Sequence, residues 1–252
     1  MINRVVAVSS VMFVSAHAVG QGFVSPDAFG WTRGDTDSTH HEWDDFTTFS
    51  GLNEPDVASS PASILNNPTI PGLRVVEGNG IITSTGNMYS FSGILEWEVT
   101  VPTFEATGGT TSVVFQTRTQ GNEIDPSTLF ANGQAPVETT ELYRFDLGGD
   151  QPFGGFIVDT LWRFEVPASQ GVTIAFAGIA SSGRLDKVSV DTILTDAGCP
   201  GDIIRDGVVD GSDFFAWVAA FGSNAPIADV NLDGDINGGD FFAWVSAFGA
   251  GC

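Results

Sequence analysis

Alternation of apolar and polar residues is the main pattern between residues 73 and 195. Within the stretch Ile94–Val101, the residues Leu95, Trp97, Val99 and Val101 are apolar, and the residues between them, Glu96, Glu98 and Thr100, are polar. A period of two is typical of a strand that is buried on one face only. The same pattern recurs at 113–118, 156–166, 172–176 and 184–194, with turn-forming glycines between the segments. Several short amphipathic strands without a helical period predict an antiparallel β-sandwich or jelly roll over residues 19–195.

This strand rhythm, together with the closing segment Leu185–Val190, resembles the jelly-roll domains of secreted bacterial proteins, many of which bind carbohydrate. The resemblance implies a β module with a polysaccharide or surface ligand. Before residue 73 the chain is rich in Asp, Thr, Gly and Pro. That composition predicts short strands and loops there.

The first 18 residues have the features of a secretory signal peptide. Arg4 supplies the positive charge, an apolar stretch runs from Val5 to Val14, and Ala16-His17-Ala18 fits a small-residue cleavage site. We expect cleavage after Ala18 and a secreted, extracellular protein, which could be attached to the cell surface. The alternative is a buried N-terminal strand. No other segment has the roughly 18 consecutive apolar residues of a membrane span, so we expect no transmembrane segment.

Acidic residues dominate the charge of the chain. It carries 31 Asp and Glu against 9 Lys and Arg, a formal net charge of −22. Such a field repels nucleic acid and anionic membrane surfaces and attracts divalent cations. We therefore expect no nucleic-acid partner.

The β module offers weak candidates for chemistry. His40, His41 and Glu42 lie among four aspartates, which suggests either a metal site or a solvated acidic loop; the loop is favoured because neighbouring histidines on a strand point apart. Glu96 and Glu98 share a strand face and could form a carboxylate pair for glycoside hydrolysis, although like charges on an exposed face are ordinary. No Gly-x-Ser-x-Gly motif supports a nucleophilic triad.

Tryptophans could stack on sugar rings. Trp31 and Trp43 are the candidates for exposed stacking residues, but core packing is favoured for any single tryptophan and most strongly for Trp97 and Trp162.

The last part of the chain contains one unit twice, at an offset of 27 residues. Asp202 recurs as Asp229, Asp213 as Asp240, and Phe-Phe-Ala-Trp occurs at both 214 and 241. The second copy has oxygen ligands at loop positions one, three, five, seven, nine and twelve, with Gly234 at six, which is the pattern of a Ca²⁺ loop. Its predicted ligands are Asp229, Asn231, Asp233, the carbonyl of Asp235, Asn237 and Asp240.

The first copy lacks one oxygen donor, because Ile204 stands at position three. Its predicted ligands are Asp202, Asp206, the carbonyl of Val208, Asp210 and Asp213. The sequence thus predicts two Ca²⁺ sites, the first weaker than the second.

No helix can enter either loop, since Pro200 and Pro226 precede them, but each loop can continue into a short helix, 214–221 or 241–248. Two loop–helix repeats resemble the type I dockerin module. The Cys-Pro-Gly-Asp opening at Cys199 and the Gly-Cys ending at Cys252 more narrowly resemble the GC-type dockerin. The resemblance covers residues 196–252 and implies a Ca²⁺-folded docking module with a cohesin-like or cell-surface protein partner. Cohesins read a hydroxyl pair at loop positions ten and eleven, where this chain has Gly211-Ser212 and Gly238-Gly239.

Two cysteines flank the repeat, and an even pair in an exported chain predicts a disulfide between Cys199 and Cys252. A lipidated or anchored terminal cysteine is the alternative. The aromatic residues of the helices could form the core between them or face a partner. The candidates for partner binding are Phe214, Phe215, Trp217, Phe241, Phe242 and Trp244.

Three functions follow from these patterns. The first is a secreted, non-catalytic protein in which a Ca²⁺-dependent module anchors a β-sandwich that binds carbohydrate or a cell or matrix surface. The second is a polysaccharide-degrading enzyme, a glycoside hydrolase or a lyase, that carries a docking module. The third is a structural protein of the cell envelope.

Overall fold

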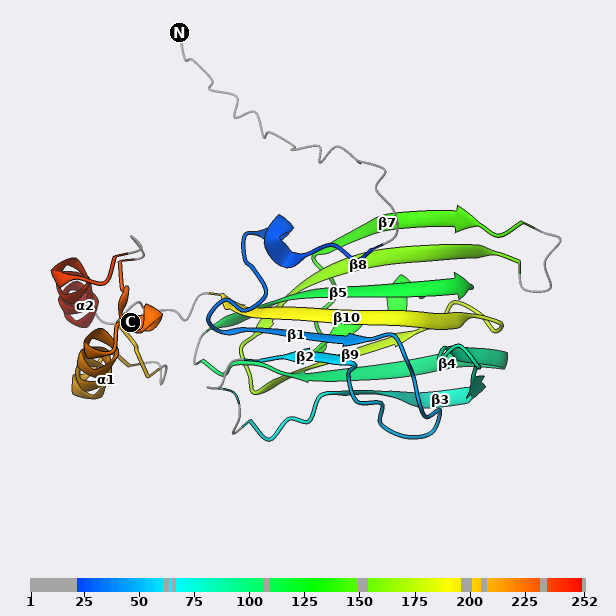
Figure 1. Cartoon of the computed structure of the whole chain (residues 1–252), viewed down its shortest axis with the longest axis horizontal. Coiled ribbons are helices and arrows are strands. Elements are labelled where there is room, and N and C mark those ends of the chain that lie inside the picture. The colour runs from blue at the N-terminus through cyan, green and yellow to red at the C-terminus, as the bar shows by residue number, and fades with distance from the viewer. Residues whose placement is uncertain are drawn as a thin grey trace, which may run out of the picture.

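The computed structural model describes residues 22–60, 64, 67–106, 109–148, 154–195, 201–204, 208–231 and 235–250. Within these ranges the protein consists of a curled antiparallel β-sheet, here the β module, and two α-helices beside one end of it (Figure 1). The predicted mainly β class with antiparallel pairing is confirmed. The expected signal peptide, residues 1–18, lies outside the described residues.

One half of the sheet is built around the strand that closes the β module in sequence, β10. Its strands follow the order β2-β1-β10-β5-β8-β7, and every pair is antiparallel. Their bounds are β1 (Ser38–Trp43), β2 (Val57–Ser59), β5 (Thr110–Gly121), β7 (Glu138–Asp146), β8 (Phe156–Pro167) and β10 (Arg184–Thr195). The edge strand β7 shows no alternation in burial, because neither of its faces covers the main core.

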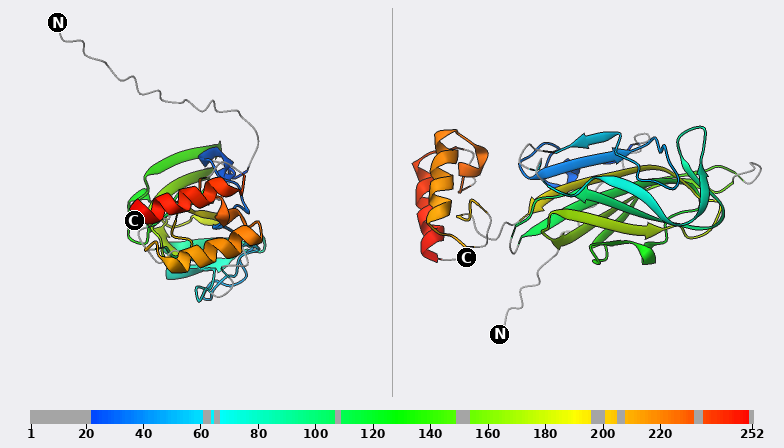
Figure 2. Two further views of the ribbon diagram at one scale, coloured as in Figure 1. Left: turned by 90° about the vertical axis from the view of Figure 1, so that its left-hand side faces the viewer. Right: turned by 90° about the horizontal axis from the view of Figure 1, so that it is seen from below.

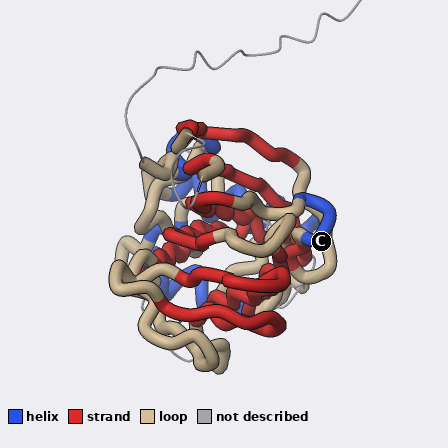
Figure 3. Tube along the Cα trace, turned by 90° about the vertical axis from the view of Figure 1, so that its right-hand side faces the viewer, coloured by secondary structure: helices blue, strands red, loops and turns tan. Residues whose placement is uncertain are grey.

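The other half has the order β3-β4-β9-β6, formed by β3 (Gly72–Ile82), β4 (Met88–Pro102), β6 (Phe130–Ala131) and β9 (Gly171–Ala177). The first two residues of β10 join the halves, since Arg184 pairs with Tyr89 and Leu185 with Met88. Figure 3, viewed along the strands, shows how the sheet curls around its interior. Short 3-10 turns lie at η1 (Pro26–Phe29), η3 (Pro126–Thr128) and η4 (Pro226–Ala228).

The core lies between the two halves and follows the predicted alternation. Leu95, Trp97, Val99 and Val101 of β4 are at most 4 % exposed, whereas Glu96 between them is exposed. A run of aromatic contacts crosses from one half to the other: Trp97 stacks on Phe176 with centroids 5.3 Å apart, and Phe176 lies 5.2 Å from Phe115. Trp97 and Trp162 are core residues, as predicted. Burial of each such side chain contributes about 2–3 kcal/mol.

The segment before β1, residues 22–37, packs across the outer face of β5, β8 and β10, and we call it the N-terminal arm. Trp31 inserts against Val114 and Leu161 in a second, smaller core. Gln116 of β5 holds the arm at both backbone groups of Val24: its Oε1 accepts from Val24 N at 2.7 Å and its Nε2 donates to Val24 O at 2.9 Å. The arm therefore gives this half of the sheet two covered faces.

The alternative in which Trp31 and Trp43 are exposed stacking residues is wrong, and the favoured core packing is confirmed for both. Trp31 points from the arm into the smaller core and is 7 % exposed. Trp43 is completely buried in the main core, where its Nε1 donates to the carbonyl of Asn53. Both tryptophans therefore have a structural role. Their packing partners are distant in sequence, so the local pattern did not reveal their burial.

The histidine-rich segment forms β1 instead of the expected solvated loop. β1 pairs with β10 and β2, and its residues His40 and His41 are 6 % and 1 % exposed. On the outer face, His40 Nδ1 lies 2.8 Å from Oδ1 of the buried Asp191, without hydrogen-bond geometry. Arg33 of the arm donates to both oxygens of Asp191 at 2.6 and 2.9 Å. The charges under the arm are thus compensated by the arm itself.

The side chain of His41 faces the main core, and its Nδ1 has no hydrogen-bond partner among the described residues. The pKa of His41 is lowered from 6.5 to about 4, mainly by burial and to a smaller extent by the neighbouring His40, while Asp191 partly opposes the shift. The unfolded chain binds this proton more readily than the folded chain. The contribution of neutral His41 to the free energy of unfolding is therefore fully present above pH 6.5 and is lost as the pH falls towards 4.

We expect His41→Gln to remove this acid sensitivity, because glutamine does not titrate. The free energy of unfolding should drop by about 3 kcal/mol less between pH 7 and pH 4 in the variant than in the parent. Urea unfolding at several pH values measures this difference. The free energy at pH 7 gives the effect of the substitution that does not depend on pH, and it is subtracted. Parallel pH profiles would contradict the assignment.

Candidate functional site

The candidate site is the repeated C-terminal unit, residues 201–250, here the C-terminal module. Its helices α1 (Gly211–Gly222) and α2 (Gly238–Ala250) lie side by side (Figure 2). Both begin three residues before the predicted starts. Of the predicted residues, Asp206, Asp233, Cys199 and Cys252 lie outside the described ranges. Those two ligands and the disulfide stay predictions.

In the first repeat, Asp213 fixes the loop to the helix. It is completely buried, and its Oδ1 accepts from Ile204 N and its Oδ2 from Asp210 N, both at 2.9 Å. The Asp210 carboxylate accepts from Ser212 N at 2.7 Å. Asp210 and Asp213 also form a capping box, in which the side chain of each accepts from the backbone N–H of the other. A capping box satisfies N–H groups that a helix start leaves open. The helix therefore begins earlier than its apolar residues indicate.

The second repeat reproduces these contacts at the same 27-residue offset. Asp240 is completely buried; its Oδ1 accepts from Val230 N at 2.9 Å and Asn231 N at 3.3 Å, and its Oδ2 from Asn237 N at 2.8 Å. Asn237 accepts from Gly239 N at 2.7 Å, as Asp210 does from Ser212 N. Burial raises the pKa of Asp240, but these backbone donors lower it by more and hold it below the usual 3.8. The carboxylate is therefore ionised at neutral pH.

The two repeats also exchange tryptophan hydrogen bonds. Trp217 Nε1 donates to Ala228 O at 3.1 Å, and Trp244 Nε1 donates to Gly201 O at 2.9 Å. Each helix thus anchors the chain that precedes the other loop. The ring contacts match: Phe214 lies 5.2 Å from Trp244, and Phe241 lies 5.8 Å from Trp217. The repeats therefore form one unit with an internal near-symmetry.

The predicted partner-binding residues divide into two groups. Trp217 and Trp244 are only 5 % and 6 % exposed and form the core between the helices, with Phe214 packed against it. Phe215 and Phe242 are 74 % and 72 % exposed. Phe241 lies between the groups at 37 %. The sequence string is the same in both repeats, and only packing separates its core members from its surface members.

We call the exposed apolar side of both helices the docking face. Phe215 is followed at helical spacing by Val218 and Phe221, and the second repeat provides the matching set. The face consists of side chains that are at least 40 % exposed, namely Phe215, Val218, Phe221, Phe242, Val245 and Phe248. An apolar patch contributed by two neighbouring helices is unusual for a free surface.

The predicted metal ligands have the chemistry of a hard-cation site. Asp202 is 4 % exposed, and no Lys or Arg in the described ranges forms a salt bridge with Asp213 or Asp240. Buried carboxylates are costly unless a positive charge compensates them. All donors in both loops are oxygens, the ligands that Ca²⁺ prefers. These residues therefore fit the ion.

Within the described part of the chain, no three His, Cys, Asp or Glu side chains already converge as a metal cluster. The carboxylates of Asp213 and Asp240 instead bind their own loops. Val208 and Asp235, whose carbonyls are predicted ligands, have exposed side chains.

The carboxylate pair of the β module is an ordinary part of a sheet surface. Glu96 is exposed, and Glu98 forms an ion pair with Arg74 of β3 at 2.5 Å. Arg74 and Glu98 are cross-strand neighbours. This pairing occupies one of the two groups that glycoside hydrolysis would use.

No protein-family model matches the chain, and no curated protein matches it. Two solved structures of the β-glucosidase from Kluyveromyces marxianus show a weak likeness. The complex with glucose has 9 % identity and a TM-score of 0.22 over 74 % of this chain and 18 % of that one. The selenomethionine-labelled form has 8 % identity and a TM-score of 0.23 over 76 % and 20 %. The chain thus spans about a fifth of the enzyme's length, and TM-scores this low carry no argument about fold or function. Among the described helices, none has the length and apolarity needed to cross a membrane.

We expect Asp213→Ala and Asp240→Ala each to unfold the C-terminal module while the β module stays folded. Each substitution leaves two or three backbone N–H groups without an acceptor, at about 1–3 kcal/mol each. Loss of helical circular dichroism at 222 nm measures the effect. Glu96→Ala, an exposed acid of β4, is the control, and helicity equal to that of the parent would contradict the assignment.

Proposed function

We propose that this is a secreted, calcium-binding modular protein in which the C-terminal module docks or anchors the β module. The observation that carries the proposal is the duplicated loop, in which Asp213 and Asp240 are buried, ionisable and joined to equivalent backbone groups. Two copies of one all-oxygen loop support cation binding more strongly than scattered acids do.

The bound Ca²⁺ would add a positive charge beside the buried carboxylates, which in the described structure are stabilised by backbone hydrogen bonds. The first loop would be held by Asp202, Asp206, Asp210, Asp213 and the Val208 carbonyl. The second would be held by Asp229, Asn231, Asp233, Asn237, Asp240 and the Asp235 carbonyl. Because both helices start from these loops, ion binding and folding of the module are coupled.

We propose unequal affinities for the two sites. Ile204 and Asn231 occupy equivalent positions, and both donate their backbone N–H to the buried aspartate of their loop. The loops thus share this backbone contact, while only Asn231 has a side-chain oxygen. Ile204 is 46 % exposed, so its side chain contributes little to the core.

The docking face would bind a cohesin-like or cell-surface protein. Its six apolar side chains are presented by rigid helices rather than loops, which limits the entropy lost on binding. The β module, proposed to be a jelly-roll sandwich, would bind carbohydrate or a cell or matrix surface. A polysaccharide-degrading enzyme with a docking module, or a structural envelope protein, is the alternative.

We expect calorimetric titration with Ca²⁺ to give one strong and one weak site. Ile204→Asn should strengthen the weak site by about tenfold through one added oxygen ligand, and Asn231→Ile should weaken the strong site by a similar factor. The two variants are each other's control. Two equal sites in the parent, or affinities that neither variant changes, would overturn the proposed inequality of the sites, and a parent that binds no Ca²⁺ would overturn the calcium assignment.

We expect the protein to bind cell-surface proteins of its native host in Ca²⁺ and to lose them in EDTA. A Phe215→Ser, Phe242→Ser double variant should reduce recovery at least tenfold, because both side chains lie on the docking face. Phe145→Ser changes an exposed phenylalanine of β7, outside the docking face, and serves as the control. If EDTA and the double substitution both leave the amount of recovered cell-surface protein unchanged, the proposed docking is excluded.

A further inference from the structure

A cavity of about 200 Å³ opens on the outer side of the β module where its two halves join. It is lined by Ile81, Thr83, Tyr89, Phe91, Gln120, Gly121, Ser182 and Arg184. This volume is below the roughly 300–1,000 Å³ of drug-sized pockets. The cavity therefore suits a single ring with its substituents.

The floor of this cavity is a row of side chains across four strands. Ile81 of β3 pairs with Tyr89 of β4, Tyr89 pairs with Arg184 of β10, and Arg184 pairs with Gln120 of β5. Paired residues place their side chains on the same face of a sheet. The row exists only where β10 bridges the two halves, so the join itself creates the cavity.

One wall of the cavity is aromatic and open to solvent. Tyr89 and Phe91 pack edge to face, with centroids 5.0 Å apart and planes at 85°. Phe91 is 60 % exposed and Ile81 is 43 % exposed. Aromatic faces carry partial negative charge, which attracts the polarised C–H groups of a sugar ring. The wall therefore offers a stacking surface.

Strained backbone also lies at the cavity. Ser182 has φ 66°, an uncommon value for a residue with a side chain. Gly121 has φ 87°, and a Cβ there would lie 2.7 Å from the Ser182 carbonyl oxygen. β3 has three register shifts between Val75 and Gly80. Bulges and strain of this kind concentrate at binding sites.

The polar groups of the cavity have spare hydrogen-bonding capacity. Within the described structure, Gln120 Nε2, Ser182 Oγ and Arg184 Nη1 make no hydrogen bond, although Gln120 Oε1 accepts from Arg184 Nη2. Asp186 already compensates the charge of Arg184 through bonds of 2.5 and 2.9 Å. Three donors without an uncompensated charge favour a neutral ligand with hydroxyl groups.

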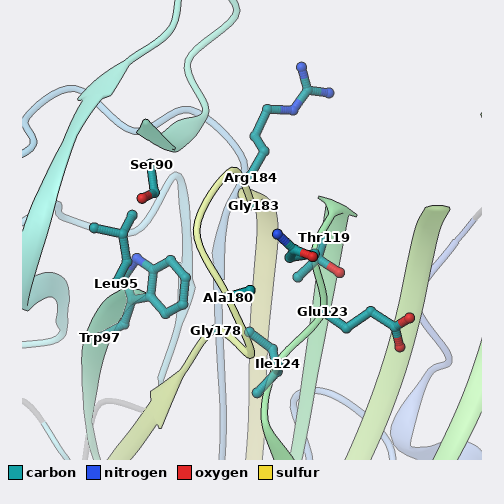
Figure 4. Close-up of a pocket in the computed structure, with 11 residues that line it drawn as sticks. Ser90, Leu95, Trp97, Thr119, Glu123, Ile124, Gly178, Ala180, Gly183 and Arg184 are labelled. Atoms are coloured by element: carbon teal, nitrogen blue, oxygen red, sulfur yellow. The ribbon is translucent and has the colours of Figure 1, made fainter. Parts of the chain in front are cut away.

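A smaller cavity lies nearby and is not the site. It has room for about 10 Å³ and is lined by core residues such as Leu95, Trp97 and Ile124. Figure 4 shows that the Arg184 side chain points away from it. A space of this size holds one water at most.

We propose that the outer cavity binds one pyranose ring of a neutral polysaccharide, stacked on Tyr89 and Phe91 and hydrogen-bonded by Gln120, Ser182 and Arg184. The net charge of −22 disfavours anionic sugars. This inference rests on the proposed carbohydrate-binding role of the β module and assigns that role to one place.

The test is calorimetric titration of the purified full chain with cellohexaose, xylohexaose, mannohexaose and laminarihexaose, and with hexagalacturonic acid as the charged comparison. We expect at least one neutral hexasaccharide to bind, and Phe91→Ala and Gln120→Ala each to weaken that binding by about tenfold or more. Phe145→Ala, which truncates an exposed phenylalanine of β7, should leave it unchanged. Thermal unfolding confirms that the variants are folded.

The outcomes separate the two levels of the proposal. Binding that Phe91→Ala and Gln120→Ala leave unchanged overturns the cavity but retains carbohydrate binding by the β module. Preference for hexagalacturonic acid overturns the neutral class. No binding to any of the five overturns both the cavity and the carbohydrate role, whereas the calcium sites are judged by their own titration.

Discussion

A buried aspartate at the start of each C-terminal helix is the constraint on which the candidate site depends. Asp213 and Asp240 each connect a loop to a helix by accepting backbone N–H groups from residues three and about ten positions earlier. A negative charge in such a place is costly without compensation. The same contact therefore explains why the helices form and why a cation would stabilise them.

The β module solves a different problem, the covering of both faces of one half of its sheet. The main core fills the interior, and the N-terminal arm covers the outer face through Trp31, the Gln116 clamp on Val24 and the Arg33–Asp191 pair. Compensated charges lie under the arm, and the uncovered join between the halves keeps an open aromatic cavity. Rigid, doubly covered strands thus hold a small exposed site in a fixed geometry.

The two parts divide the proposed work between them. The C-terminal module presents repeated apolar side chains on rigid helices, which suits a protein partner, and the cavity presents one aromatic wall with hydroxyl-binding groups, which suits a sugar. Figure 1 shows the helices beside one end of the sheet. Attachment and recognition would therefore use separate surfaces.

The sequence by itself determined the elements whose period or spacing is local. Alternation in Leu95–Val101 located β4, and the 27-residue repeat located both helices to within three residues of their starts, because strands and sequence repeats have fixed internal spacings. Only the tertiary structure decided which residues are covered. The polar residues of β1 resembled those of an acidic loop. They can be buried because Arg33 and β10 compensate them, and both are distant from β1 in sequence. Phe215 and Trp217 belong to the same Phe-Phe-Ala-Trp segment. Packing against the second repeat buries Trp217, whereas Phe215 stays exposed. The cavity row joins four strands and has no local signal, since register between distant segments is fixed only when the sheet closes.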